Sequence, residues 1–315
     1  MKFGILFSGQ GAQRPGMGID LMADPLFAST IQEASEAVGM DLLPIMKNEN
    51  GALEQTKNVQ PALVAVSYGL YKMLMRDLNL QVGGMIGLSL GEYAALLASQ
   101  GLEFKNGMAL LADRARYMQA VADETPSAMA ALLKPDVEAV EAICDQVTVD
   151  GNLVSIANYN TPKQVVIGGT VAGVKAASDQ VKATKVARRA IELPVSGAFH
   201  TALFNPARDQ MVERLKAVPV QDPQVPVISN TTEEPFAASS MKTILAKQLA
   251  VPTHFGAGLK KLTTLTNLDA TLELGPGKTL TSFAQVIVPD LKHYHISNLA
   301  EYQAFVTEVE NGTDE

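Results

Sequence analysis

The chain has 315 residues, of which 47% are apolar and 18% are charged. A chain of this length forms one large domain or two unequal ones, and its composition excludes a disordered or fibrous protein. The 25 basic and 33 acidic residues give a formal net charge of −8. Phosphate binding needs a basic surface, so we expect no nucleic acid among the partners.

The longest stretches without a charged residue, such as residues 78–91, are short and rich in glycine and serine. A transmembrane helix needs about 20 mostly apolar residues, so we also expect no membrane as a partner. Cys144 is the single cysteine, which leaves it no partner for an intrachain disulfide. This usage favours a reducing compartment, the cytoplasm.

Apolar runs alternate with amphipathic segments over most of the chain. Strands are predicted at residues 2–7, 84–88, 225–229 and 270–274. Helices are predicted at residues 25–38, 58–78, 91–99, 104–122, 201–218 and 241–249. This alternation predicts an α/β fold with a parallel sheet covered on both faces. The last dozen residues, rich in Glu, Asn, Gly and Asp, are expected to form a frayed tail.

The middle of the chain has a different pattern. Strands are predicted at residues 128–133, 154–158, 164–168 and 186–193, with helices at 137–147 and 171–183. The resulting order, βαββαβ, is ferredoxin-like. We therefore predict that residues 125–194 form a small domain inserted into a larger one built from residues 1–124 and 195–315.

A nucleophile motif follows the second predicted strand. Residues 87–91 read Gly-Leu-Ser-Leu-Gly, which fits G-x-S-x-G between a strand and a helix. Such a turn is so sharp that side chains two residues either side of Ser89 would collide, and glycine removes them. The turn would lift the Ser89 hydroxyl out of the fold, with backbone N–H groups of the next helix aimed at it.

A serine nucleophile needs a base, which is most often histidine. The chain has four histidines. His293 and His295 alternate on a predicted strand without a third metal ligand, so a structural pair is the favoured interpretation. His200 follows the return of the chain from the inserted domain, at a junction that would face a cleft. Position favours His200 over His254.

Arg114 falls within the apolar stripe of the helix predicted at residues 104–122. A buried guanidinium needs an anionic partner. That partner is either an internal carboxylate or a substrate carboxylate held by a bidentate fork. A substrate clamp is expected to leave Arg114 exposed at the floor of an empty pocket.

Glycine-rich turns give weaker signals. Residues 9–14 lack the third glycine of a dinucleotide fingerprint, because position 14 is arginine. The turn could donate an N–H group to an oxyanion, or it could be an ordinary tight turn.

Motifs over most of the chain, in consistent order and spacing, resemble the malonyl-CoA:acyl carrier protein transacylases, the discrete acyltransferases of fatty acid synthesis. They are GQGAQ at 9–13, QPAL at 60–63, SLGEY at 89–93, R-x-x-x-M-Q at 114–119, AMAA at 128–131, N-Y-N-x-P-x-Q-V-V-I-G at 158–168, F-H at 199–200, Q-L at 248–249 and GPGK at 275–278. The resemblance implies an α/β-hydrolase-like core with an inserted ferredoxin-like domain.

The resemblance also implies a role for each matching residue. Ser89 would be acylated, His200 would be its base, and Arg114 would hold the malonyl carboxylate. The main-chain carbonyl of Gln248 would orient the histidine in place of an acid. The backbone N–H groups of Gln10 and Leu90 would form the oxyanion hole. Gln60 and Phe199 would bind substrate, and Phe199 before the histidine resembles the malonyl-selective members of the family. Leu88 departs from the family, which often has histidine before the nucleophile.

The implied reaction moves malonyl from malonyl-CoA to the pantetheine thiol of acyl carrier protein, with no cofactor beyond the coenzyme A thioester. A trans-acting acyltransferase of a polyketide synthase would share every motif. A serine esterase or thioesterase is a further alternative, although no acid has an obvious claim to its triad. Carrier proteins of this family's pathway are acidic, so docking on a chain of charge −8 needs a local basic patch. The candidate residues are Lys182, Lys185, Arg188 and Arg189.

Overall fold

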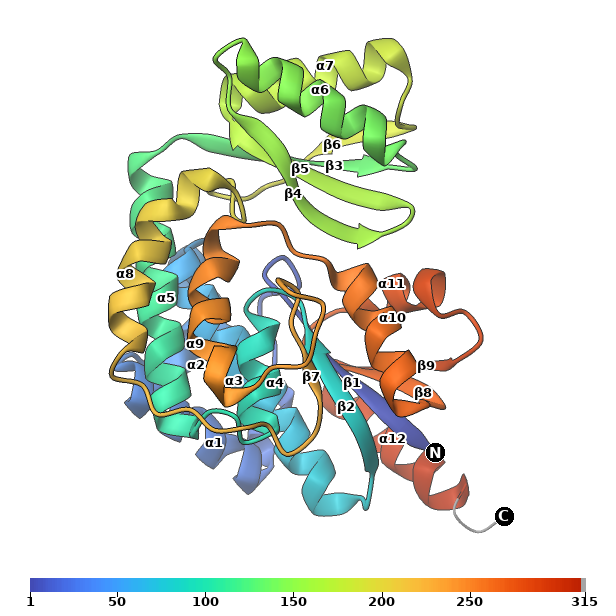
Figure 1. Cartoon of the computed structure of the whole chain (residues 1–315). Coiled ribbons are helices and arrows are strands. Elements are labelled where there is room, and N and C mark those ends of the chain that lie inside the picture. The colour runs from blue at the N-terminus through green and yellow to red at the C-terminus, as the bar shows by residue number, and fades with distance from the viewer. Residues whose placement is uncertain (313–315) are drawn as a thin grey trace.

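The computed structural model describes residues 1–312, and its centre is a five-stranded parallel sheet of order β7-β2-β1-β8-β9 (Figure 1). The strands are Val227–Ile228 (β7), Gln81–Gly87 (β2), Lys2–Phe7 (β1), Ala270–Leu274 (β8) and Lys292–Ile296 (β9). Five of the six residues of β1 are buried, because helices cover both faces of the sheet. The predicted α/β class is therefore confirmed.

Two helical layers cover this sheet, and alternate residues of β1 point into each. Ile5 and Phe7 join the larger core, whereas Leu6 joins a smaller core beneath two helices. Those two are α10 (Phe255–Thr266) and α11 (Thr279–Ile287). The larger core includes α1 (Pro25–Val38), α2 (Leu42–Met46), α3 (Thr56–Asp77), α4 (Gly91–Ala98), α5 (Phe104–Glu124), α8 (Asn205–Leu215), α9 (Ala238–Lys247) and α12 (Leu299–Gly312).

A separate antiparallel sheet of order β4-β5-β3-β6 lies above the large one in Figure 1. Its elements are β3 (Ser127–Leu133), α6 (Val137–Val149), β4 (Val154–Thr161), β5 (Gln164–Thr170), α7 (Val171–Thr184) and β6 (Arg189–Glu192). Ala130 and Leu132 pack with α6 and α7, while Met129 and Ala131 point the other way, toward the large core. The period of two along β3 thus separates a core face from a face directed at the large domain.

The small sheet is tied to one segment of the large domain. The backbone N–H of Tyr159 donates to the carbonyl of Thr253 at 2.7 Å, and Thr253 donates to the carbonyl of Ala157 at 3.0 Å. The side-chain amide of Asn158 donates to the Thr253 hydroxyl at 2.7 Å. These bonds join β4 to the segment that follows the short 3-10 helix Gln248–Ala250.

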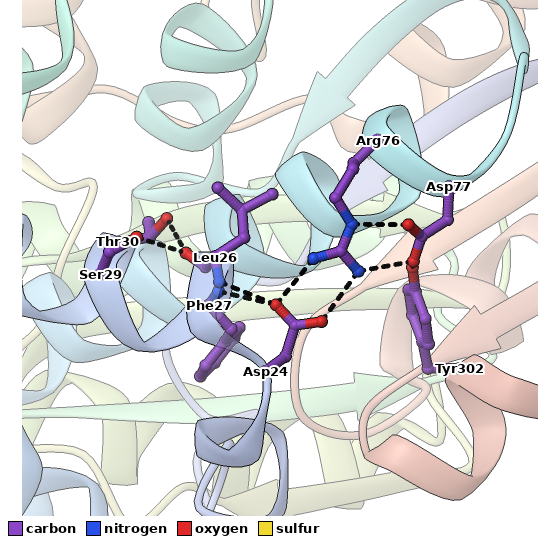
Figure 2. A network of polar contacts seen from close by, with 8 residues as sticks. All are labelled: Asp24, Leu26, Phe27, Ser29, Thr30, Arg76, Asp77 and Tyr302. Carbon is purple, nitrogen blue, oxygen red and sulfur yellow. Dashed lines mark hydrogen bonds and ion pairs between the residues drawn. The ribbon is translucent and has the colours of Figure 1, made fainter.

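The expectation of a frayed C-terminal tail was wrong for residues 304–312, and residues 313–315 lie outside the described part. The chain forms helix α12 there because Leu299, Tyr302, Phe305 and Val309 recur at helical spacing and pack on the sheet. The Tyr302 hydroxyl also donates to Asp77, which shares the guanidinium of Arg76 with Asp24 (Figure 2). This network joins α12 to the C-terminal end of α3 and the N-terminal end of α1.

Other predicted elements differ mainly at their ends. The predicted strand at 186–193 is only Arg189–Glu192, because it is an exposed edge strand paired with β3 alone. The predicted helix at 201–218 is a 3-10 turn, Ala202–Phe204, followed by α8 from Asn205. Across residues 1–312, no helix is both long and apolar enough to cross a membrane.

Candidate active site

Ser89 occupies a sharp turn between β2 and α4. Its φ is 54°, in the left-handed region that residues other than glycine rarely adopt. A Cβ at position 87 would lie 2.0 Å from the carbonyl carbon of Gly91. The two glycines therefore let the chain fold back on itself, and β2 carries the serine to the carboxyl edge of the sheet.

His200 lies against this turn. Its Nε2 is 2.8 Å from the Ser89 hydroxyl oxygen, and its Nδ1 is 2.8 Å from the main-chain carbonyl oxygen of Gln248. The carbonyl can only accept, so Nδ1 carries the hydrogen and Nε2 is free to accept the serine proton. Burial, and secondarily the charge of Arg114, lower the pKa of His200 to about 4.

Arg114, on α5, reaches the same serine from the other side. Its Nη2 donates to the Ser89 hydroxyl oxygen at 3.0 Å and to the side-chain oxygen of Gln248 at 2.9 Å. Its Nη1 donates to the side-chain oxygen of Gln60 at 2.6 Å. The guanidinium also stands 5.5 Å from the ring centroid of Tyr93.

The expectation that Arg114 would be exposed in the empty pocket was wrong. The side chain is 0% exposed, because Ser89, Gln60 and Gln248 cover it. All its hydrogen-bond acceptors in the described part of the chain are neutral oxygens, so no internal carboxylate is hydrogen-bonded to it. Burial lowers the pKa of Arg114. Ser89 lines the cavity, and the guanidinium lies behind it, hydrogen-bonded to the Ser89 hydroxyl oxygen.

A cavity of about 520 Å³ opens onto Ser89 and His200 between the two sheets. Met129, Ala131 and Val166 of the small sheet form much of its apolar wall. The lining also includes four residues that were singled out from the sequence, namely Gln10, Gln60, Leu88 and Phe199. Leu90 is buried at the start of α4, and Gln10 follows β1, so the two backbones leave the carboxyl ends of neighbouring parallel strands.

Glu92 and Asn230 belong to this site and were not found from the sequence. Glu92, which is 0% exposed, accepts hydrogen bonds from the backbone N–H of Asn230 and from the side-chain amide of Gln248. Asn230 donates its own amide to the carbonyl of Gly87 at 2.8 Å. Burial raises the pKa of Glu92, whereas the hydrogen bonds from Asn230 and Gln248 and the charge of Arg114 counter that rise. A charged residue within an apolar helix directly after the nucleophile was the available signal.

His254, the other histidine considered as a base, lies outside this cluster. It is the N-cap residue just before α10, it stacks on Tyr159 with ring centroids 4.7 Å apart, and its Nδ1 lies 3.3 Å from a carboxyl oxygen of Glu233. Within residues 1–312, no group of three or more His, Cys, Asp or Glu side chains could hold a metal ion.

The fold and the serine–histidine pair define an acyl-transfer enzyme, and comparison with known proteins agrees. The model of the acyl transferase domain matches residues 5–289. A malonyl CoA-acyl carrier protein transacylase of Bacillus subtilis (strain 168) is 36% identical over 300 residues, which cover 94% of each protein. The chain therefore belongs to the acyl transferase family and, within it, to the malonyl CoA-acyl carrier protein transacylases.

Solved structures support this membership. The crystal structure of MCAT from Streptococcus pneumoniae superposes with a TM-score of 0.92 at 35% identity, covering 98% of this chain and 100% of that one. A second neighbour is a malonyl-transacylase in complex with its type II polyketide acyl-carrier protein, with a TM-score of 0.92 at 32% identity. It covers 98% of this chain and all of that chain.

Proposed function

We propose that this enzyme transfers a malonyl group from malonyl-CoA to the pantetheine thiol of acyl carrier protein and so supplies the extender unit of fatty acid synthesis. The observation that carries the proposal is the Ser89 hydroxyl oxygen, which lies 2.8 Å from His200 Nε2 and 3.0 Å from Arg114 Nη2. One atom thus contacts both a general base and a cation. A base beside a serine suits acyl transfer, and a buried guanidinium suits an acyl group with a free carboxylate.

In the first half-reaction, His200 Nε2 takes the Ser89 proton while the serine oxygen attacks the thioester carbon. The Gln248 carbonyl holds the protonated imidazole through Nδ1. The N–H groups of Gln10 and Leu90 would stabilise the oxyanion. The carbon–sulfur bond then breaks, and coenzyme A leaves as a thiol after taking the proton from His200.

Arg114 would select the acyl group. The malonyl carboxylate would replace the neutral oxygens that now cover the guanidinium and form charge-assisted hydrogen bonds with it. An acetyl group offers no carboxylate and would leave that charge with its present neutral partners. Phe199 and Gln60, both on the cavity wall, would bound the space available to the acyl chain.

The second half-reaction reverses these steps with the pantetheine thiol as nucleophile, which gives ping-pong kinetics. We propose that the acidic carrier protein docks on Lys182, Lys185, Arg188 and Arg189, which are all exposed around the end of α7 and the start of β6. The chain leads from β6 directly into residues 193–196 on the cavity wall. No cofactor is needed, and the cytoplasm is the proposed compartment.

The test is to incubate the protein with malonyl-CoA, quench in acid and read the intact mass, with acetyl-CoA and Ser89→Ala in parallel. We expect one malonyl adduct on the wild type, none on Ser89→Ala, and little label from acetyl-CoA. Free malonate without an adduct would instead indicate a hydrolase. Equal labelling by both thioesters would keep the transferase and remove Arg114 as its selector.

A further inference from the structure

The transfer sequence above leaves one buried carboxyl group of the site without a role. Glu92 follows Ser89 by three residues, and each of its oxygens faces a nitrogen donor. One donor is the backbone N–H of Asn230, and the other is the side-chain amide of Gln248. A carboxylate accepts at both oxygens, whereas a carboxamide would turn its own NH₂ toward one of the donors.

The Gln248 side chain connects this carboxylate to the guanidinium. Its oxygen accepts from Arg114 at 2.9 Å, and its nitrogen donates both to Glu92 and to the Ser89 carbonyl at 3.0 Å. The amide therefore lies between the guanidinium and the Glu92 carboxyl group, with its oxygen toward the guanidinium and its NH₂ toward a carboxyl oxygen. Rotating the amide by half a turn would place its NH₂ against the guanidinium, donor to donor.

We propose that Glu92 is a positioning residue for acyl selection, acting through the Gln248 amide to hold Arg114 in the orientation that receives the acyl carboxylate. This inference rests on the proposed malonyl transfer. Glu92 does not touch the cavity wall, and it acts on the clamp rather than on the base. His200 is held by the main-chain carbonyl of Gln248, which does not depend on how the side-chain amide is turned.

The first test is Glu92→Gln, assayed by the rates at which malonyl-CoA and acetyl-CoA acylate Ser89. In either orientation, the NH₂ of the new amide faces one of the two N–H donors, on Asn230 or on Gln248. We therefore expect the Gln248 amide to turn and Arg114 to shift. The ratio of malonyl to acetyl acylation should fall about tenfold, the size of a lost charge-assisted hydrogen bond. Acylation by acetyl-CoA should fall less than acylation by malonyl-CoA, since the acetyl group has no carboxylate for Arg114 to bind. An unchanged ratio would overturn the proposal.

The second test asks whether Glu92 acts through Gln248. Gln248→Met removes the side-chain amide and keeps the main-chain carbonyl. We expect Glu92→Gln to lower the malonyl-to-acetyl ratio in the wild-type background but to lower it no further in Gln248→Met. Fully additive losses in the double variant would show that the two residues act independently, contrary to the proposal.

A matched control separates positioning from general damage. Glu273 is also 0% exposed and accepts hydrogen bonds from four donors, on Ser8, Leu280 and Thr281. Glu273→Gln should lower the melting temperature and keep the ratio. Should Glu92→Gln fail to fold, Glu92→Asp withdraws the carboxylate by one methylene, and an unchanged ratio in that variant would refute the proposal. A wild type that takes no malonyl label would refute the proposed function instead.

Discussion

The surroundings of Arg114 set the chemistry of the site at the scale of single residues. Removing a guanidinium from water costs several kcal/mol unless its donors are satisfied. Here the oxygens of Gln60, Gln248 and Ser89 satisfy the two Nη atoms, while Nε has no partner in the described part of the chain. A cation held by neutral groups retains its attraction for an anion, which suits a site that must exchange a substrate carboxylate.

We predict that Arg114→Ala lowers acylation of Ser89 by malonyl-CoA by about 10- to 100-fold, the value of one or two charge-assisted hydrogen bonds. Acylation by acetyl-CoA should not fall in proportion, because that group has no carboxylate to pair. Rapid-quench mass spectrometry measures both rates. Arg116→Ala, two residues along the same helix and 65% exposed, is the control. Equal losses with both thioesters would contradict a selective clamp.

The lowered pKa of His200 predicts an unusual pH profile. Its imidazole is the base only when unprotonated, and its pKa is lowered to about 4. The kcat/KM for malonyl-CoA should therefore stay flat from pH 7.5 down to about pH 5 and fall only below that. Circular dichroism at each pH would establish that the protein remains folded. An acid limb centred near the ordinary histidine value of about 6.5 would contradict this prediction.

At the scale of elements, aromatic and polar side-chain contacts hold helix α12 to the rest of the large domain. Helix α12 packs Phe305 on Phe3 and Tyr294, with ring centroids 5.8 and 5.3 Å apart. Its Tyr302 joins the Arg76 network, which also includes Asp24, the residue that caps α1. The helices α1, α3 and α12, which are far apart in the chain, therefore share one polar junction (Figure 2).

We predict that Phe305→Ala lowers the free energy of unfolding by about 3–5 kcal/mol, since it removes a 4% exposed aromatic ring and leaves a cavity. Urea denaturation measures the change. Val149→Ala, at a side chain 83% exposed, should change the free energy by less than about 0.5 kcal/mol. An effect as small for Phe305→Ala would mean that this segment frays after all.

The Arg76 network predicts a pH-dependent contribution to stability. Hydrogen bonds from Arg76 lower the pKa of Asp24 and of Asp77. A lowered carboxyl pKa stabilises the fold above the ordinary value of about 3.9, and this contribution is lost as the pH falls through the lowered pKa. Because Arg76 is 40% exposed, we expect Arg76→Met to cost only about 1 kcal/mol at pH 7.

The measurement is urea denaturation of wild type and Arg76→Met at pH 7 and at successively lower pH. The difference between them should shrink toward zero in acid. Arg208→Met, at an exposed pair with Asp209, is the control and should cost less. A difference that is independent of pH would mean that Arg76 stabilises the fold by packing alone.

At the scale of the whole molecule, the cavity lies between two sheets of different kind. The large sheet carries the nucleophile to its edge, and the small sheet supplies an apolar wall. The small sheet also hydrogen-bonds, through Ala157 and Tyr159, to Thr253, in the segment just after Gln248. These hydrogen bonds therefore connect the apolar wall of the cavity to the segment that carries Gln248, whose carbonyl orients His200.

The basic patch gives a prediction for docking. Reversing charge in Arg188→Glu/Arg189→Glu should raise the KM for acyl carrier protein about tenfold or more, because the patch would then repel an acidic partner. Formation of the malonyl-enzyme from malonyl-CoA should change little. Lys47→Glu/Lys216→Glu, with both lysines exposed and far from this patch in the sequence, is a charge-matched control. Unchanged turnover with the carrier protein would remove the patch as the docking surface.

Much of the fold and of the candidate site could be predicted from local sequence. Buried parallel strands are short apolar runs, and helices bury one stripe, so the periods of Lys2–Phe7 and Phe104–Glu124 are visible without coordinates. The turn at Ser89 is equally local, because two glycines at fixed offsets are a steric requirement of the backbone. Family motifs then singled out His200, Arg114 and Gln248 by position in the chain.

Tertiary structure alone decided which groups touch. Helix α12 forms because its Phe305 packs against Phe3 and Tyr294. Considered locally, the polar residues of this segment resemble a frayed tail. The burial of Arg114 and the link from Glu92 through Gln248 depend on segments up to 156 residues apart. Hydrogen bonds between such segments require positions accurate to a fraction of an ångström, and only the packing of the complete core provides these.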